Sequence, residues 1–102
     1  MDIQLKKGIL DLLVLNILST EDAYGYDIYQ SIKRELNISE STIYPILRKM
    51  VKEGYLDTYL EASPDGPPRK YFKLTKTGKT RYNSLCSSWI DFKDSIERLL
   101  NR

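Results

Sequence analysis

The sequence contains no histidine, and its five glycines are scattered along 102 residues. The missing histidine excludes Ser-His and Cys-His nucleophilic schemes and His-bearing metal sites. The scattered glycines exclude a glycine-rich phosphate-binding loop. The carboxylate pairs, Glu21 with Asp22 and Asp91 with Asp94, fall on expected solvent faces rather than in a pocket. The sequence therefore predicts that the protein is not an enzyme and uses no metal or cofactor.

The sequence also has only one cysteine, Cys86, and no long apolar run. A lone cysteine cannot form an internal disulfide, which favours a reducing compartment, and we interpret it as a packing residue rather than a redox sensor. No apolar run reaches the roughly 18 residues that a membrane-spanning helix needs. The first residues lack the order of segments that marks a signal peptide. We therefore expect a cytoplasmic protein with no membrane partner.

A chain of this length forms one modest core, and small domains often gain stability by pairing with a copy of themselves.

Positive charge is distributed unevenly, although the formal net charge is only +2. Residues 67–89 contain no Asp or Glu. The cations of this stretch are Arg69, Lys70, Lys73, Lys76, Lys79 and Arg81. A local basic field attracts polyanions such as nucleic acid, whereas the alternative is an ordinary solvated face.

The first predicted helix, over residues 5–19, is apolar on almost every side. A helix of this kind must be covered on every side. The core of so small a protein covers only about half of it. The remaining face, which holds Leu5, Ile9, Leu12 and Asn16, is predicted to meet a second chain.

A helix-turn-helix is predicted from the next elements. A second helix runs from about 24 to 36, and a third starts near Ser39 or Ser41 as its cap and ends at Gly54. Ile43, Ile46, Leu47 and Met50 form the buried stripe of the third helix. Its outward hydroxyls and cations suit a helix that lies in a DNA major groove, although a cationic surface helix is the alternative. The candidate DNA contacts are Ser39, Ser41, Thr42, Tyr44, Pro45, Arg48 and Lys49.

The pattern after the third helix alternates with a period of two, which indicates strands. Residues 63–68 are dense in turn residues and are predicted to form a loop. The second strand is expected over 69–75, with Phe72 and Leu74 inward and Lys70 outward. Such a hairpin is a wing, and its basic strand is expected to lie along phosphates. The candidate phosphate contacts are Arg69, Lys70 and Lys73.

The last predicted helix begins after Thr75 as its cap and runs to about Leu100. Its apolar residues step by three and four, which is the spacing of helices that pair. A helix of ~24 residues is about 36 Å long, whereas a globule of this length has a radius of gyration near ~13 Å. We therefore expect the helix to project or lie across a second subunit, whereas the alternative is a helix that folds back on its own core. The predicted dimer interface is Leu85, Trp89, Phe92, Ile96 and Leu99.

The predicted fold is mainly α with a small β-hairpin (α+β). Residues 1–76 form a winged helix-turn-helix DNA-binding domain, and residues 77–102 form a dimerisation helix. The order and spacing of several motifs resemble the PadR-like family of bacterial transcriptional regulators along nearly the whole chain. These motifs are Gly8 before the apolar helix, residues 24–28, 41–47, 53–56 and 69–75, and Gly78. The resemblance implies a dimer that binds a near-palindromic operator and usually represses, with the last helix packed on the partner's first helix.

The short last helix resembles a smaller PadR-like subgroup. Some members of that subgroup enclose a pore at the dimer interface, where a tryptophan from each subunit sandwiches flat aromatic drugs. The resemblance implies an effector site lined by Trp89, Phe92, Leu5, Ile9 and Leu12, with Asp11 supplying charge to a cationic ligand. Paired indoles suit planar ligands of varied shape. The alternative is that Trp89 only buries area in the seam.

The sequence therefore predicts a sequence-specific DNA-binding transcriptional regulator. We expect a homodimeric repressor that acts on double-stranded operator DNA and is released by a small flat aromatic or cationic effector. The alternative is a winged helix used only to bind proteins. The two differ in salt dependence, because proteins that contact phosphates lose affinity steeply with salt.

Overall fold

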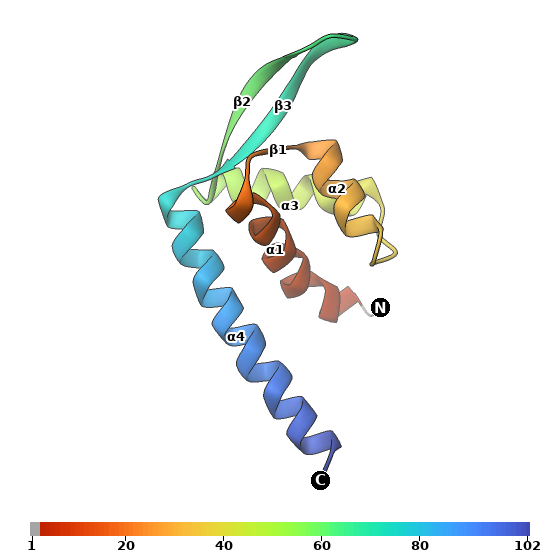
Figure 1. Cartoon of the computed structure of the whole chain (residues 1–102), viewed down its shortest axis with the longest axis vertical. Helices are drawn as coiled ribbons and strands as arrows, with labels where there is room; N and C mark the ends of the chain where they lie inside the picture. Colours follow the sequence, from red (N-terminus) through yellow and green to blue (C-terminus); the bar gives the residue numbers. More distant parts are fainter. Residues whose placement is uncertain (1–2) are drawn as a thin grey trace.

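The computed structural model describes the backbone of residues 3–102 and the side chains of residues 8–102 (Figure 1). Its elements follow the order α1 (Ile3–Thr20), β1 (Ala23–Tyr24), α2 (Gly25–Lys33), α3 (Glu40–Lys52), β2 (Leu56–Ser63), β3 (Gly66–Leu74) and α4 (Lys76–Leu100). The strands form one antiparallel sheet in the order β1-β3-β2. This arrangement confirms the predicted winged helix-turn-helix with a long C-terminal helix.

The core lies where α1, α2, α3 and the base of the hairpin meet. Its buried side chains are Leu10, Val14, Leu15, Leu18, Ile28, Tyr29, Ile32, Ile38, Ile43, Leu47, Met50, Leu56 and Phe72. In α1, Leu12, Leu13 and Ile17 are only partly buried, as expected for a helix with apolar residues on every side. Asn16 belongs to the face predicted to meet a second chain, but its side-chain amide donates to the Tyr82 hydroxyl of α4 at 2.6 Å. α4 of the same chain therefore contacts part of this predicted face, while the Asn16 side chain remains exposed.

The ends of α3 are defined by two different arrangements. At the C-terminal end, Gly54 has a φ of 84°, and the amide of Tyr55 donates to the Met50 carbonyl at 2.9 Å. This is the Schellman pattern that a glycine after the helix allows. At the N-terminal end, Ser39 occupies the cap position, but its side chain accepts no backbone amide. The predicted serine cap is therefore wrong, and the Ser39 hydroxyl bonds to the Ser41 hydroxyl at 2.8 Å instead.

The hairpin of β2 and β3, which we call the wing, differs from the prediction in two ways. First, β3 begins at Gly66, so Pro67 and Pro68 lie in a strand rather than in a loop. Proline is tolerated there because an edge position needs no amide donor, and β1 pairs with β3 only at Tyr71 and Phe72. A register shift between Glu61 and Ser63 adjusts the pairing near the tip.

Second, Lys70 shares a face with Phe72 rather than pointing the opposite way. Alternate residues of a strand lie on one face, and the Lys70 ammonium is 5.8 Å from the centre of the Phe72 ring. Lys70 is nevertheless exposed, because the wing extends past the core (Figure 1). Its cross-strand partner Leu60 is also exposed, at 68% of its surface. The prediction that Lys70 points outward was wrong about its face and right about its exposure.

α4 lies beside α1 over its first half and then continues away from the rest of the chain (Figure 1). The molecule measures 56 × 29 × 21 Å, and its radius of gyration is 15.1 Å. The predicted cap is confirmed, because the Thr75 hydroxyl accepts from the Gly78 amide at 2.9 Å. The same hydroxyl donates to the Gly54 carbonyl at 2.7 Å. None of the helices that the structure describes is long and apolar enough to cross a bilayer.

Candidate nucleic-acid interface

The outer face of α3 carries the residues that were predicted to contact bases. Its apolar stripe is buried in the core, which turns the opposite side of the helix to solvent. The exposed candidates are Ser39, Ser41, Thr42, Pro45, Arg48 and Lys49. The Ser39 hydroxyl bonds to the hydroxyls of Ser41, at 2.8 Å, and Thr42, at 3.3 Å. A hydroxyl can donate one hydrogen bond and accept others, which suits contacts to either base edges or phosphates.

Tyr44 differs from these residues because it is half-buried. Burial raises the pKa of its hydroxyl, and the carboxylate of Glu40 raises it further. The hydroxyl therefore stays protonated at neutral pH and retains its donor. A Cβ at Gly25 would lie 3.4 Å from the Tyr44 ring and 3.2 Å from the Phe72 ring. The glycine thus lets α2, α3 and the wing approach one another closely.

The charged groups on α3 are only weakly paired. Lys49 forms an ion pair with Glu53 one turn later, at 3.7 Å, and both side chains are largely exposed. Exposed pairs of this kind contribute little to stability. A polyanion that approaches this side of α3 therefore meets a lysine held only loosely by its neighbour.

The three predicted wing cations lie on different faces. Arg69 and Lys73 are on one face, where the register places them opposite Glu61 and Asp57. Lys70 is on the other face, where its cross-strand partner is uncharged Leu60. The guanidinium of Arg69 lies 5.1 Å from the centre of the Tyr24 ring of β1. Lys70 is thus the wing cation without a carboxylate directly across the strands, which the sequence alone did not reveal.

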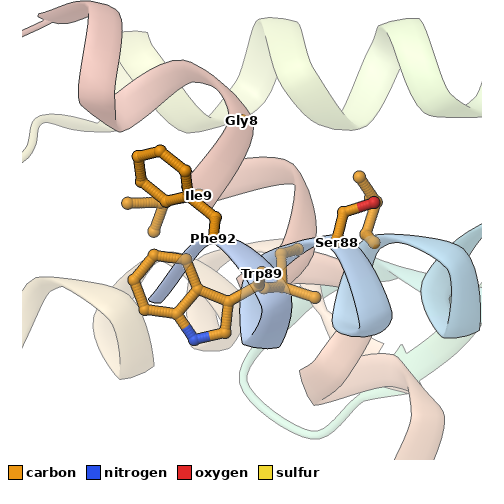
Figure 2. A pocket seen from close by; sticks show the side chains of 7 residues that line it. Gly8, Ile9, Ser88, Trp89 and Phe92 are labelled. Atoms are coloured by element: carbon orange, nitrogen blue, oxygen red, sulfur yellow. The ribbon is translucent and has the colours of Figure 1, made fainter. Parts of the chain in front are cut away.

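α1 and the middle of α4 line a separate open cavity of about 250 Å³. Figure 2 shows the Trp89 and Phe92 rings projecting to the same side, next to Ile9. The ring centroids are 6.5 Å apart, and their planes are tilted by 43°. The complete lining is Gly8, Ile9, Leu12, Leu85, Ser88, Trp89 and Phe92. Four predicted ligand-contacting residues, Ile9, Leu12, Trp89 and Phe92, are therefore brought together.

The other two predicted effector-site residues, Leu5 and Asp11, have different outcomes. Leu5 lies outside the residues whose side chains the structure describes. Asp11 lines a different, small cavity with Lys49 and Arg81. Asp11 and Leu12 line different cavities because one step along a helix turns a side chain by about 100°. Gly8 and Ser88 were missed, although each lies one position before a residue that was predicted.

The fold and the exposed face of α3 define the class of protein as a winged helix-turn-helix protein. A family model described as the transcriptional regulator PadR-like family matches residues 14–84. The chain therefore belongs to the PadR-like family of transcriptional regulators. It is a DNA-binding transcription regulator and not an enzyme.

Similar proteins support this assignment over nearly the whole chain. A PadR-like transcriptional regulator from Bacillus cereus has a crystal structure with a TM-score of 0.88 and 34% identity, covering 97% of this chain and 98% of that one. A protein from Streptococcus mutans has a TM-score of 0.87 and 41% identity, covering 92% and 88%. An uncharacterised protein X from Lysinibacillus sphaericus is 32% identical over 95 residues, covering 89% of this chain and 87% of that protein.

Proposed function

We propose that this regulator is a repressor that binds a near-palindromic operator as a homodimer. The observation that carries the proposal is the uncovered apolar face of α4. Trp89, Phe92, Ile96 and Leu99 are 38–58% exposed along one seam. A contiguous apolar patch of this kind typically marks an interface, and helices with this spacing pair with one another.

Residues 1–76 would then read DNA, and residues 77–102 would join two copies. A twofold dimer carries two copies of α3, which match half-sites of inverted sequence. A dimer bound to an operator excludes other proteins from that stretch of duplex, which is the simplest route to repression. The proposed dimer interface is Leu85, Trp89, Phe92, Ile96 and Leu99.

The proposal divides the contacts between α3 and the wing. Hydroxyls at the start of α3 would contact base edges, whereas cations would contact phosphates and carry little sequence information. The proposed contacts are Ser39, Ser41, Thr42, Tyr44, Pro45, Arg48, Lys49, Arg69, Lys70 and Lys73. Because no carboxylate faces Lys70 across the strands, we expect it to contribute more than Arg69.

Selection of bound DNA from a random pool tests the proposal directly. We expect an enriched inverted repeat, and enrichment of no sequence would contradict specific binding. Gel-shift titrations with operator and scrambled duplexes then separate the two kinds of contact. Thr42→Ala should lower mainly the preference for the operator, whereas Lys70→Ala should weaken both duplexes alike. Equal loss of preference in the two variants would overturn the division.

A second proposal concerns the cavity between α1 and α4. Its aromatic and aliphatic lining supports binding of a flat aromatic or cationic effector that loosens the dimer from DNA. Trp89 is the only tryptophan, so its fluorescence reports directly on this cavity. We expect planar cationic dyes to quench it.

The matched variants for this test are Trp89→Ala and Asp11→Asn. Dye binding to both variants is measured by the fluorescence of the dye itself, because Trp89→Ala lacks the indole. Trp89→Ala should abolish dye binding. Asp11→Asn should leave it nearly unchanged, because Asp11 lines the other cavity. Unchanged dye affinity in Trp89→Ala would show that the indole only packs in the seam and does not bind the dye.

A further inference from the structure

Three tyrosine rings form a row across the base of the wing, with one ring from each strand. Tyr59 of β2 stacks on Tyr71 of β3, with centroids 5.7 Å apart and planes inclined by 18°. Tyr71 then contacts Tyr24 of β1, with centroids 6.1 Å apart. At the outer end of the row, the Tyr59 hydroxyl donates to a carboxylate oxygen of Asp22 at 2.7 Å. Asp22 belongs to the turn between α1 and β1, so the row joins the wing to the body of the protein.

The wing needs such a connection because most of it is a two-stranded ribbon. β1 pairs with β3 at only two positions, at the very base of the wing. An isolated two-stranded hairpin is marginally stable in water, so its direction depends on what holds the base. Leu56 and Phe72 are buried against the core on one face. The tyrosine row holds the opposite face.

We propose that Asp22, Tyr24, Tyr59 and Tyr71, which we call the tyrosine anchor, fix the direction of the wing and so position its cations for DNA. This inference rests on the proposed function of the wing as a phosphate-contacting element. Arg69 connects the anchor to the cations of the wing, because its guanidinium carbon lies 5.1 Å from the centre of the Tyr24 ring. These four are positioning residues, since they act through the wing and not by touching DNA.

The chemistry of the hydrogen bond supports this role. The bond to Asp22 raises the pKa of Tyr59 to about 12, with further contributions from burial and from the negative charge of Asp22. The hydroxyl therefore remains protonated, and the bond remains intact, throughout the physiological range. Aromatic pairs in offset or tilted geometry add stabilisation beyond the area that they bury.

The test compares variants of the full-length protein in duplex binding at several salt concentrations. Tyr59→Phe removes only the hydroxyl and keeps the ring. Asp22→Ala removes the acceptor, whereas Asp22→Asn loses the same charge but keeps an oxygen that accepts the bond. We expect Tyr59→Phe and Asp22→Ala to bind about three- to tenfold more weakly, on the scale of one hydrogen bond. Asp22→Asn should bind like the wild type or slightly more tightly.

The salt dependence separates positioning from general stability. Losing one phosphate contact lowers the slope of log affinity against log salt by about 1, and we expect this change in Tyr59→Phe and Asp22→Ala. Lys70→Ala should weaken binding less in the Tyr59→Phe background than in the wild type, because the contact is already partly lost. Tyr82→Phe is the matched control, since it deletes a tyrosine hydroxyl that bonds Asn16 rather than Asp22.

Each outcome decides the question. Wild-type affinity and slope in both Tyr59→Phe and Asp22→Ala, with intact circular dichroism spectra, would overturn the anchor alone. Binding by Asp22→Asn as weak as that of Asp22→Ala would also overturn it, because charge rather than the hydrogen bond would then matter. Wild-type protein without any salt-sensitive binding to duplex DNA would overturn the proposed function, and the anchor with it.

Discussion

α3 and α4 both carry an apolar stripe, but only one of these stripes is covered by the chain itself. In α3, Ile43 and Leu47 are 0% and 1% exposed. In α4, Phe92 and Ile96 are 53% and 38% exposed. The apolar stripe of α3 is therefore covered within one chain, and the polar side of this helix faces solvent. The apolar stripe of α4 is left exposed, and it is the face that we propose to meet a second chain.

The largest effect should follow from damage to the covered stripe. Leu47→Ala removes a fully buried side chain and leaves a cavity, which typically costs about 3 kcal/mol of the free energy of unfolding. Urea denaturation measures this change. Ile90→Ala on exposed α4 is the control and should change stability by less than about 0.5 kcal/mol. Equal losses of stability in the two variants would contradict the difference proposed between the covered stripe of α3 and the exposed surface of α4.

Damage to the uncovered stripe should affect association rather than folding. Ile96→Asp places a charge in the proposed seam, and burying an unpaired charge is costly. We expect the dissociation constant of the dimer to rise by about 100-fold or more, equivalent to about 2.7 kcal/mol. Sedimentation equilibrium measures it, with helical content followed by circular dichroism. A variant that stays dimeric at the same concentration would place the interface elsewhere.

A smaller effect should follow at the junction of the two helices. Thr75→Ala removes the cap of α4 and its bond to the Gly54 carbonyl at the end of α3. Loss of such a cap costs about 1 kcal/mol. Thermal unfolding of Thr75→Ala and Thr75→Ser tests this prediction, because serine restores the hydroxyl. A serine variant as unstable as the alanine variant would assign the effect to the lost methyl group.

The smallest effect on stability is expected on the outer side of α3. Lys49→Ala breaks an exposed ion pair with Glu53, so the free energy of unfolding should change by less than about 0.5 kcal/mol. DNA affinity should nevertheless fall, and fall alike for operator and scrambled duplexes. A Lys49→Ala variant that loses stability but keeps its DNA affinity would contradict the assignment of Lys49 to DNA binding rather than to folding.

Local patterns in the sequence were sufficient for the four helices, the hairpin and both stripes, but not for the short strand β1. The period of Ile43, Leu47 and Met50 predicted the buried side of α3, and the heptad spacing predicted the exposed seam of α4. These signals are local because the residues of one helix face recur every three or four positions. The residues of the outer side of α3 followed from the same pattern.

Features that depend on contacts between distant segments were not predicted. Asp22 and Tyr59 are 37 positions apart, and no periodicity links a turn to a strand that far along the chain. The strand conformation of Pro67 and Pro68 depends on where β1 stops pairing. Each of these is set by tertiary packing, which a pattern of apolar residues does not encode.

The link through Thr75 also has a geometric consequence. Its hydroxyl bonds both Gly54, which follows the end of α3, and the first turn of α4. A Cβ at Gly78 would collide with the Tyr55 carbonyl oxygen. These contacts connect the end of α3 to the start of α4 within each chain. In a symmetric dimer, the separation of the two α3 helices would therefore depend on the angle at which the two α4 helices cross.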